Sequence, residues 1–113
     1  MREPSSNDFP VDVEGLGTFK FARRTIPDAL RIRGLFSEFS VNEQDLELVG
    51  AANAYATVCV LCSGTPDGFG EFDDYDLISD ADGLQKLFRV YEALVAKEDS
   101  FRQRGQKTGA GAG

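Results

Sequence analysis

The sequence predicts an α+β fold, mostly α, in which an N-terminal β-hairpin is followed by three helices. Apolar and polar residues alternate on both sides of the segment EGLG, and three later stretches repeat apolar residues every three or four positions. The 113 residues fit one domain, and 42% apolar content with nine Phe and three Tyr suffices for a packed core. We therefore expect a single globular domain over 9–104, a flexible N-terminal arm over 1–8 and a disordered Gly-rich tail over 105–113.

The predicted hairpin has strands over residues 9–13 and 17–23. In the second strand Phe19 and Phe21 occupy alternate positions, so both project to one face. The connecting segment supplies two glycines, which adopt positive φ without strain in a tight turn. The alternation therefore predicts two antiparallel strands with one apolar face.

The first helix is predicted over 26–39. Thr25 can cap its N-terminus, Pro27 suits the first turn, and Asp28 complements the helix dipole there. Apolar residues at helical spacing follow, although a glycine in the interior weakens the pattern.

The second helix is predicted over 43–62 and the third over 81–103. The second begins with the acidic segment NEQDLE and then becomes small and apolar, which is typical of a central, largely buried helix. The third repeats apolar residues with the helical period. The predicted core consists of Phe19, Phe21, Ile32, Leu35, Phe36, Leu48, Ala52, Tyr55, Val58, Leu61, Leu84, Leu87, Phe88, Tyr91 and Leu94.

The net charge of −7 disfavours a nucleic-acid-binding protein, which needs a basic face to contact phosphates. No stretch approaches the roughly 20 apolar residues of a membrane helix. The N-terminal segment MREPSSNDFP lacks the apolar region of a secretion signal. We therefore expect a cytoplasmic protein that binds neither nucleic acid nor membrane.

The sequence contains no complete catalytic or metal-binding motif. It has no His, so the usual nucleophile–base pairs are missing. Cys59 and Cys62 form a C-x-x-C pair that could serve redox chemistry or half of a zinc site, but no further Cys or His is present to complete a zinc site. We interpret the two cysteines as small core residues, and expect no enzyme activity and no cofactor.

The acidic segment over 63–83 does not fit a calcium-binding EF-hand. When Asp80, Asp82 and Gly83 are placed at loop positions three, five and six, an arginine falls at position twelve, which requires Glu. A solvated acidic loop is the favoured interpretation, and catalysis by paired carboxylates stays open. A looser cation site is an alternative, and its ligands would be Asp73, Asp74 and Asp76.

Charges of opposite sign are separated along the chain. Five cations and a single acid occupy the stretch over 20–33, whereas eleven acids and no cation lie between Arg33 and Lys86. Two interpretations stay open: these are two solvated faces, or they meet head to tail between copies of the chain. The residues predicted for such self-association are Arg23, Arg24, Arg31, Arg33, Asp73, Asp74 and Asp76.

The order of four segments resembles the small tail assembly chaperones of long-tailed bacteriophages and prophages. These segments are GTFKFARRTIPDALRI, an Ala-rich middle helix, a TPDGF loop and LQKLFRVYEALVAKEDSFR, which together span about residues 17–102. The last segment matches the family pattern at Tyr91, Ala93, Leu94, Lys97, Glu98, Phe101 and Arg102. The chain departs from the family at its Gly-rich tail and at Phe69, where Trp is frequent.

The resemblance implies a non-enzymatic role in virion morphogenesis. Such chaperones bind the tape-measure protein, a long apolar helical chain, keep it soluble in the host cytoplasm and leave before the tail is complete. It also implies a homo-oligomer and contact with the tail tube protein. Helix-in-groove binding would use apolar anchors at helical spacing, and the candidate anchors are Leu35, Phe36, Phe39, Leu87, Phe88, Tyr91, Leu94 and Phe101.

Two other functions are retained as alternatives. One is a structural or connector subunit of the phage tail, which would stay in the mature particle. The other is a small metal-binding or enzymatic domain that uses the acidic loop.

Overall fold

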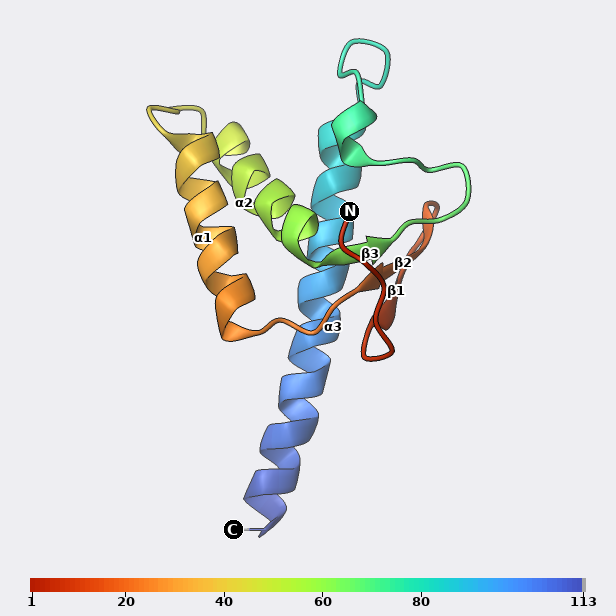
Figure 1. Cartoon of the computed structure of the whole chain (residues 1–113), viewed down its shortest axis with the longest axis vertical. Helices are drawn as coiled ribbons and strands as arrows, with labels where there is room; N and C mark the ends of the chain where they lie inside the picture. The colour runs from red at the N-terminus through yellow and green to blue at the C-terminus, as the bar shows by residue number, and fades with distance from the viewer. Residues whose placement is uncertain (113) are drawn as a thin grey trace.

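The computed structural model describes the backbone of residues 1–112 and the side chains of residues 1–103. A small sheet and two helices lie on either side of one long helix (Figure 1). The elements in chain order are β1 (Phe9–Val13), β2 (Gly17–Phe21), α1 (Ile26–Ser40), α2 (Leu46–Leu61), β3 (Cys62–Gly64), the 3-10 turn η1 (Phe72–Asp74) and α3 (Gly83–Ala112). The predicted class, α+β and mostly α, is confirmed.

The predicted hairpin is present, and a third strand joins it. Val11 lies opposite Phe19 in the antiparallel pair of β1 and β2, and both side chains are buried. β3 pairs antiparallel with β2, giving the strand order β1-β2-β3. The prediction of helix through residue 62 was therefore wrong at its end: Cys62 is extended because it pairs with Phe21 across the sheet. The continuous apolar run AYATVCVLC gave no sign of this change.

The predicted start of α1 is confirmed by a capping box. The Thr25 hydroxyl accepts a hydrogen bond from the Asp28 N–H at 3.3 Å, and the Asp28 carboxylate accepts one from the Thr25 N–H at 3.1 Å. Arg2 adds an ion pair to the same carboxylate at 3.0 Å, which attaches the N-terminal segment to α1.

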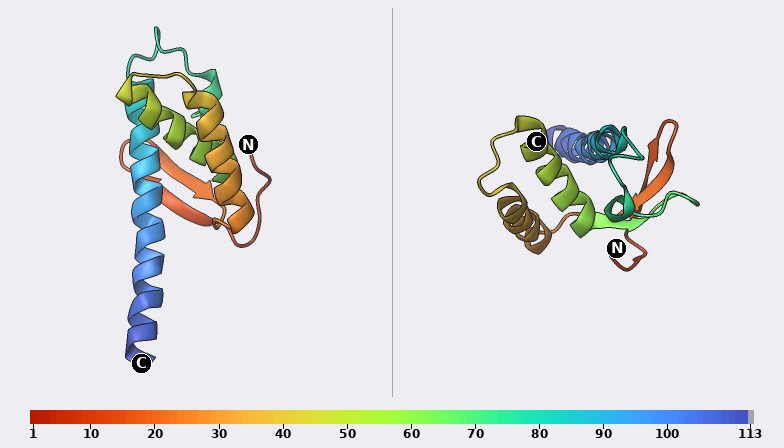
Figure 2. Two further views of the ribbon diagram at one scale, coloured as in Figure 1. Left: turned by 90° about the vertical axis from the view of Figure 1, so that its left-hand side faces the viewer. Right: turned by 90° about the horizontal axis from the view of Figure 1, so that it is seen from above.

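α2 lies between α1 and α3, as Figure 2 shows from above. Its alanines are largely buried, and their small side chains let both neighbouring helices come close. This agrees with the predicted central, buried helix. Asp45 caps its N-terminus, so the helix begins at Leu46, later than the predicted residue 43.

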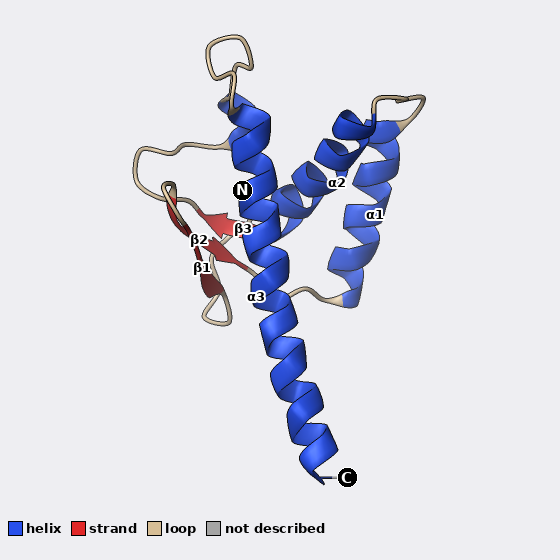
Figure 3. Cartoon of the chain, turned by 180° about the vertical axis from the view of Figure 1, so that it is seen from behind, coloured by secondary structure: helices blue, strands red, loops and turns tan. Residues whose placement is uncertain are grey.

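α3 passes between the sheet on one side and the α1–α2 pair on the other (Figure 3). It continues beyond the predicted end at residue 103, as far as Ala112, through most of the segment predicted as a disordered tail. Glycine has low helix propensity, so nothing in that segment predicted the continuation. Gly113 lies outside the described residues.

The core is formed where the apolar face of the sheet meets α2 and α3. Phe19, Phe21, Leu61 and Leu94 are fully buried, as predicted. Leu48 is exposed, so its assignment to the core was wrong, because it lies on the side of α2 that the other elements leave open. Of the remaining predicted core residues, those that are only half-buried are Leu35, Phe36, Tyr55, Leu84, Phe88 and Tyr91.

Candidate functional site

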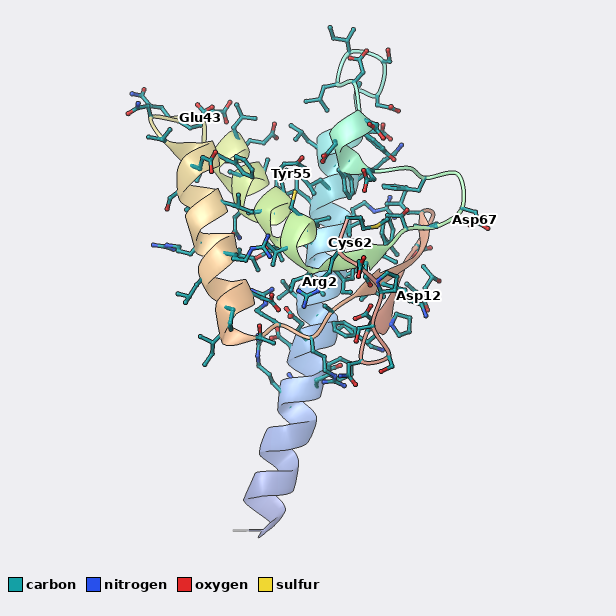
Figure 4. All side chains as sticks on the ribbon, viewed as in Figure 1. Arg2, Asp12, Glu43, Tyr55, Cys62 and Asp67 are labelled. Carbon is teal, nitrogen blue, oxygen red and sulfur yellow. The ribbon has the colours of Figure 1, made fainter. Side chains whose placement is uncertain are left out.

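A groove of about 310 Å³ lies between α2, the start of α3 and the loop over residues 65–82 that joins β3 to α3. We call it the apolar groove. It is lined by Phe39, Glu43, Leu48, Ala51, Ala52, Tyr55, Phe72, Tyr75, Leu77, Gly83, Leu84 and Leu87. Figure 4 places Glu43 on the loop between α1 and α2, at one end of this region, and Tyr55 along α2.

The wall over 65–82 is held in place by aromatic rings that pack edge-on or tilted against one another. Phe69 packs edge-on against Phe19 of the sheet, with ring centroids 4.9 Å apart, and against Phe72 at 5.1 Å. Tyr75 continues the cluster, with its centroid 5.4 Å from that of Phe72. Aromatic pairs in such geometries contribute beyond the area that they bury. The loop is therefore tied to the core although its acidic composition is typical of a solvated segment.

The groove leaves large apolar side chains in contact with solvent. Phe39, Leu48 and Leu77 keep 42%, 40% and 50% of their surface exposed. The floor is formed by alanines of α2, so these side chains stand at its edges. Covering such a surface with an apolar partner is favourable, because it removes apolar area from water.

Several polar side chains beside the groove form hydrogen bonds or ion pairs with one another. The Tyr55 hydroxyl donates a hydrogen bond to the Asp73 carboxylate. Burial, and then this hydrogen bond, raise the pKa of Tyr55 above its ordinary value, so the phenol stays neutral. Lys86 lies 4.0 Å from Asp80 and 3.7 Å from Asp82. The charged side chains next to the groove are therefore mainly acidic, while its lining is mainly apolar.

The predicted partner-binding residues occupy different environments. Leu87 and Leu94 are buried, because α3 turns them towards α2 and the sheet, and they therefore serve the core of the isolated chain. Phe39 is the exposed member of the set and lies at the edge of the groove. The half-buried members are Leu35, Phe36, Phe88, Tyr91 and Phe101.

Sequence reasoning missed Leu48, Leu77 and Leu84 as groove residues. Leu77 was the detectable one, since Leu77 and Ile78 are an isolated apolar pair within the acidic segment. Gly83 lets this leucine fold back against the start of α3, because a Cβ at Gly83 would lie 2.8 Å from Leu77 Cδ2. Leu48 gave no signal, since α2 is apolar on most of its faces.

Two of the predicted self-association cations are engaged within the chain. Arg24 donates two hydrogen bonds to Glu98, from Nε at 3.2 Å and from Nη2 at 3.0 Å. Arg23 stacks on Phe101, with its guanidinium 5.0 Å from the ring centroid. These contacts join the end of β2 to α3.

The other two predicted cations lie on α1. Arg33 lies 5.8 Å from the centre of the Phe36 ring, and Arg31 is exposed. Among the ion pairs of the described residues, neither arginine is paired with Asp73, Asp74 or Asp76. Asp76 accepts hydrogen bonds from the Ile78 N–H and the Ser79 hydroxyl. Asp73 accepts the hydrogen bond from the Tyr55 hydroxyl, and Asp74 is exposed.

The two cysteines differ in burial. Cys62 is buried, but Cys59 is exposed, so its assignment to the core was wrong: it lies on the side of α2 turned towards a second cavity, of about 130 Å³. Burial raises the pKa of both thiols, which disfavours the reactive thiolate. Within the part of the chain that the structure describes, no three Cys, Asp or Glu side chains form a group able to hold a metal ion.

In comparisons with known proteins, no family model, curated protein or solved structure matches the chain. Among the described residues, no helix combines the length and the apolar character needed to cross a membrane. Functional inference therefore depends on the surfaces of the molecule, and above all on the apolar groove.

Proposed function

We propose that this chain is a non-enzymatic binding protein, a phage tail assembly chaperone that holds amphipathic helical segments of the tape-measure protein in its apolar groove. The observation that carries the proposal is the set of half-exposed side chains at the groove edges: Phe39, Leu48 and Leu77. An amphipathic helix with apolar residues at i, i+3, i+4 and i+7 would cover all three. The resemblance in sequence supplies the identity of the partner.

Binding at one groove is expected to be weak. Full burial of a Leu or Phe side chain contributes about 1.5–3 kcal/mol, and these three are already about half covered, so they gain roughly 3 kcal/mol together. Loss of translational and rotational freedom opposes this gain. Weak single sites suit a protein that coats a long chain in many copies, because the partner stays covered while each copy can still be displaced.

Charge supports the same function. Eleven acids lie between Arg33 and Lys86, in the part of the chain that contains most of the groove. An acidic rim attracts basic amphipathic helices, and a net charge of −7 keeps coated complexes dispersed. In this proposal the protein acts in the host cytoplasm as a homo-oligomer along the tape-measure protein, and leaves when the tail tube protein assembles.

The test uses neighbouring substitutions on the groove wall. A fluorescent amphipathic peptide of about 20 residues, with Leu and Lys on opposite faces, is titrated with the full chain and followed by anisotropy. Leu77→Asp should weaken binding about tenfold or more, since it removes an anchor and leaves a carboxylate to desolvate. Ile78→Asp is the matched control: Ile78 is 94% exposed and does not line the groove. Equal binding by the two variants would contradict the groove as the site.

A second measurement tests the partner. The chain is expressed together with a tape-measure protein, and the soluble fraction of that protein is measured. The wild type and Ile78→Asp should keep it soluble, whereas Leu77→Asp should not. If the peptide binds in the groove but the tape-measure protein precipitates with all three, the groove is a helix-binding site and the chaperone assignment is wrong.

A further inference from the structure

The side of α1 that faces away from α2 is exposed, and no other element covers it within the part of the chain that the structure describes. Leu30 and Val41 are each 68% exposed, and Gly34 and Ser37 lie between them. Val41 is the C-cap residue that directly follows the helix, and we call these four residues the outer face of α1. The opposite side of the helix carries the buried residues Asp28 and Ile32, and α1 forms the outer edge of the molecule in Figures 1 and 2.

The spacing within the outer face is that of a helix-pairing seam. Positions 30, 34, 37 and 41 alternate steps of four and three, as the a and d positions of a heptad do. Leucine and valine stand at the ends, and the two small residues lie at the centre. A Cβ at Gly34 would have no atom within 4 Å, so another helix can approach the backbone closely there. The surface therefore fits a second helix.

The charges beside the seam identify that second helix. Arg31 and Glu38 each directly follow a seam residue and are seven residues apart, so they lie on the same edge of α1. Both are exposed, and neither has an ion-pair partner among the described residues. Along the axis they are separated by about 10 Å, too far for them to pair with one another.

An antiparallel copy of α1 satisfies both charges at once. When two antiparallel helices pair, equivalent edges face one another, so Arg31 of each copy meets Glu38 of the other. The same arrangement sets Leu30 of each copy beside Val41 of the other and brings the two small residues together at the centre. In a parallel pair this edge of α1 would face the opposite edge of the partner helix, so Arg31 and Glu38 would not meet.

We propose that the chain forms a two-fold symmetric dimer through the outer faces of α1. Arg31 keeps the self-association role that the sequence predicted, with Glu38 as its partner in place of the acidic loop. The dimer does not depend on the proposed function, because the outer face and the apolar groove have no residue in common. A helix of 15 residues is about 22 Å long, so the interface is small and association should be reversible.

The test is the molar mass of the full chain in solution, measured by sedimentation equilibrium from about 1 to about 500 µM, a range over which mass action shifts a weak dimer. The wild type should pass from monomer to dimer. Arg31→Glu and Glu38→Arg should each weaken association about tenfold, because each substitution places two pairs of like charges across the two-fold symmetric interface. The double variant Arg31→Glu/Glu38→Arg restores both pairs in the reverse sense and should regain the wild-type dissociation constant.

Leu30→Glu should abolish the dimer, while Leu46→Glu, at an exposed leucine outside the face, should leave it unchanged. Far-UV circular dichroism confirms that each variant is folded. A wild type that stays monomeric throughout would overturn the proposal. So would a double variant no better than the single ones, or a dimer that survives Leu30→Glu, since the contact would then lie on another face.

Discussion

Adding one methyl group at Gly17 should destabilise the fold strongly. Gly17 begins β2 with φ of +121°, a conformation that residues with a side chain rarely adopt. Gly17→Ala therefore has to change the backbone of the hairpin or displace the loop that forms one wall of the groove, because the added Cβ would lie 2.8 Å from Cβ and Cγ of Pro66.

The magnitude follows from two opposing effects. Backbone strain at a glycine-only conformation costs about 1–3 kcal/mol, and displacement of Pro66 adds to it. Alanine restricts the unfolded chain and so returns about 0.4–1 kcal/mol. We expect a net loss of roughly 2 kcal/mol in the free energy of unfolding, which in a domain of this size lowers Tm by about 8 °C.

Gly50→Ala is the control, because adding the same methyl group there should raise the free energy of unfolding. Gly50 lies within α2, where alanine is favoured over glycine by about 1 kcal/mol. Its added Cβ would lie 3.6 Å from Cε1 of Phe88, an ordinary van der Waals contact. Urea unfolding followed by circular dichroism at 222 nm measures both variants. If Gly17→Ala equals or exceeds the wild type in stability, the steric reasoning at the hairpin is refuted.

Three further substitutions or reagents examine the polar groups. Glu98→Ala should lower the free energy of unfolding by about 2 kcal/mol, since it removes the carboxylate that accepts both hydrogen bonds from Arg24. Urea unfolding measures this loss, and the difference between Glu98→Ala and Glu98→Gln separates the contribution of the charge. Burial alone would raise the pKa of Asp28, but the hydrogen bonds that it accepts outweigh burial and hold the pKa below 3.8. Asp28→Asn should therefore lose stability at pH 7, and the difference from wild type should shrink as pH falls below 3.8; equal slopes of stability against pH would contradict this. Iodoacetamide should alkylate Cys59 in the folded chain and Cys62 only after unfolding, as mass spectrometry can show.

Local signals in the sequence were enough to predict most elements. The hairpin was recognisable because its alternation reflects one buried face, and the start of α1 because Thr25 and Asp28 satisfy each other's backbone groups within one turn. Both features depend on residues close together in the chain. The third strand depends on pairing between Cys62 and Phe21, which are distant in sequence, and so it was missed.

The groove could be predicted only in part for a related reason. Periodicity identifies α2 as a helix, but α2 is apolar on most faces, so its sequence does not say which face the other elements cover. Leu48 was assigned to the core for this reason and lies at the groove edge instead. Leu77 joins the groove through the path of the 65–82 loop, which aromatic contacts with the sheet determine.

The two proposed surfaces have a joint consequence. A dimer through α1 carries two apolar grooves, related by the two-fold axis, so a long partner with repeated helical segments can occupy both. The second contact then forms at the high effective concentration that the first one creates, and affinity rises without any new contact in either groove. A peptide that repeats the binding segment after a flexible linker should therefore bind wild type more tightly than Leu30→Glu, whereas a single segment should bind both equally. Equal affinity of the repeated peptide for the two proteins would mean that the grooves act independently, even if the dimer itself is present.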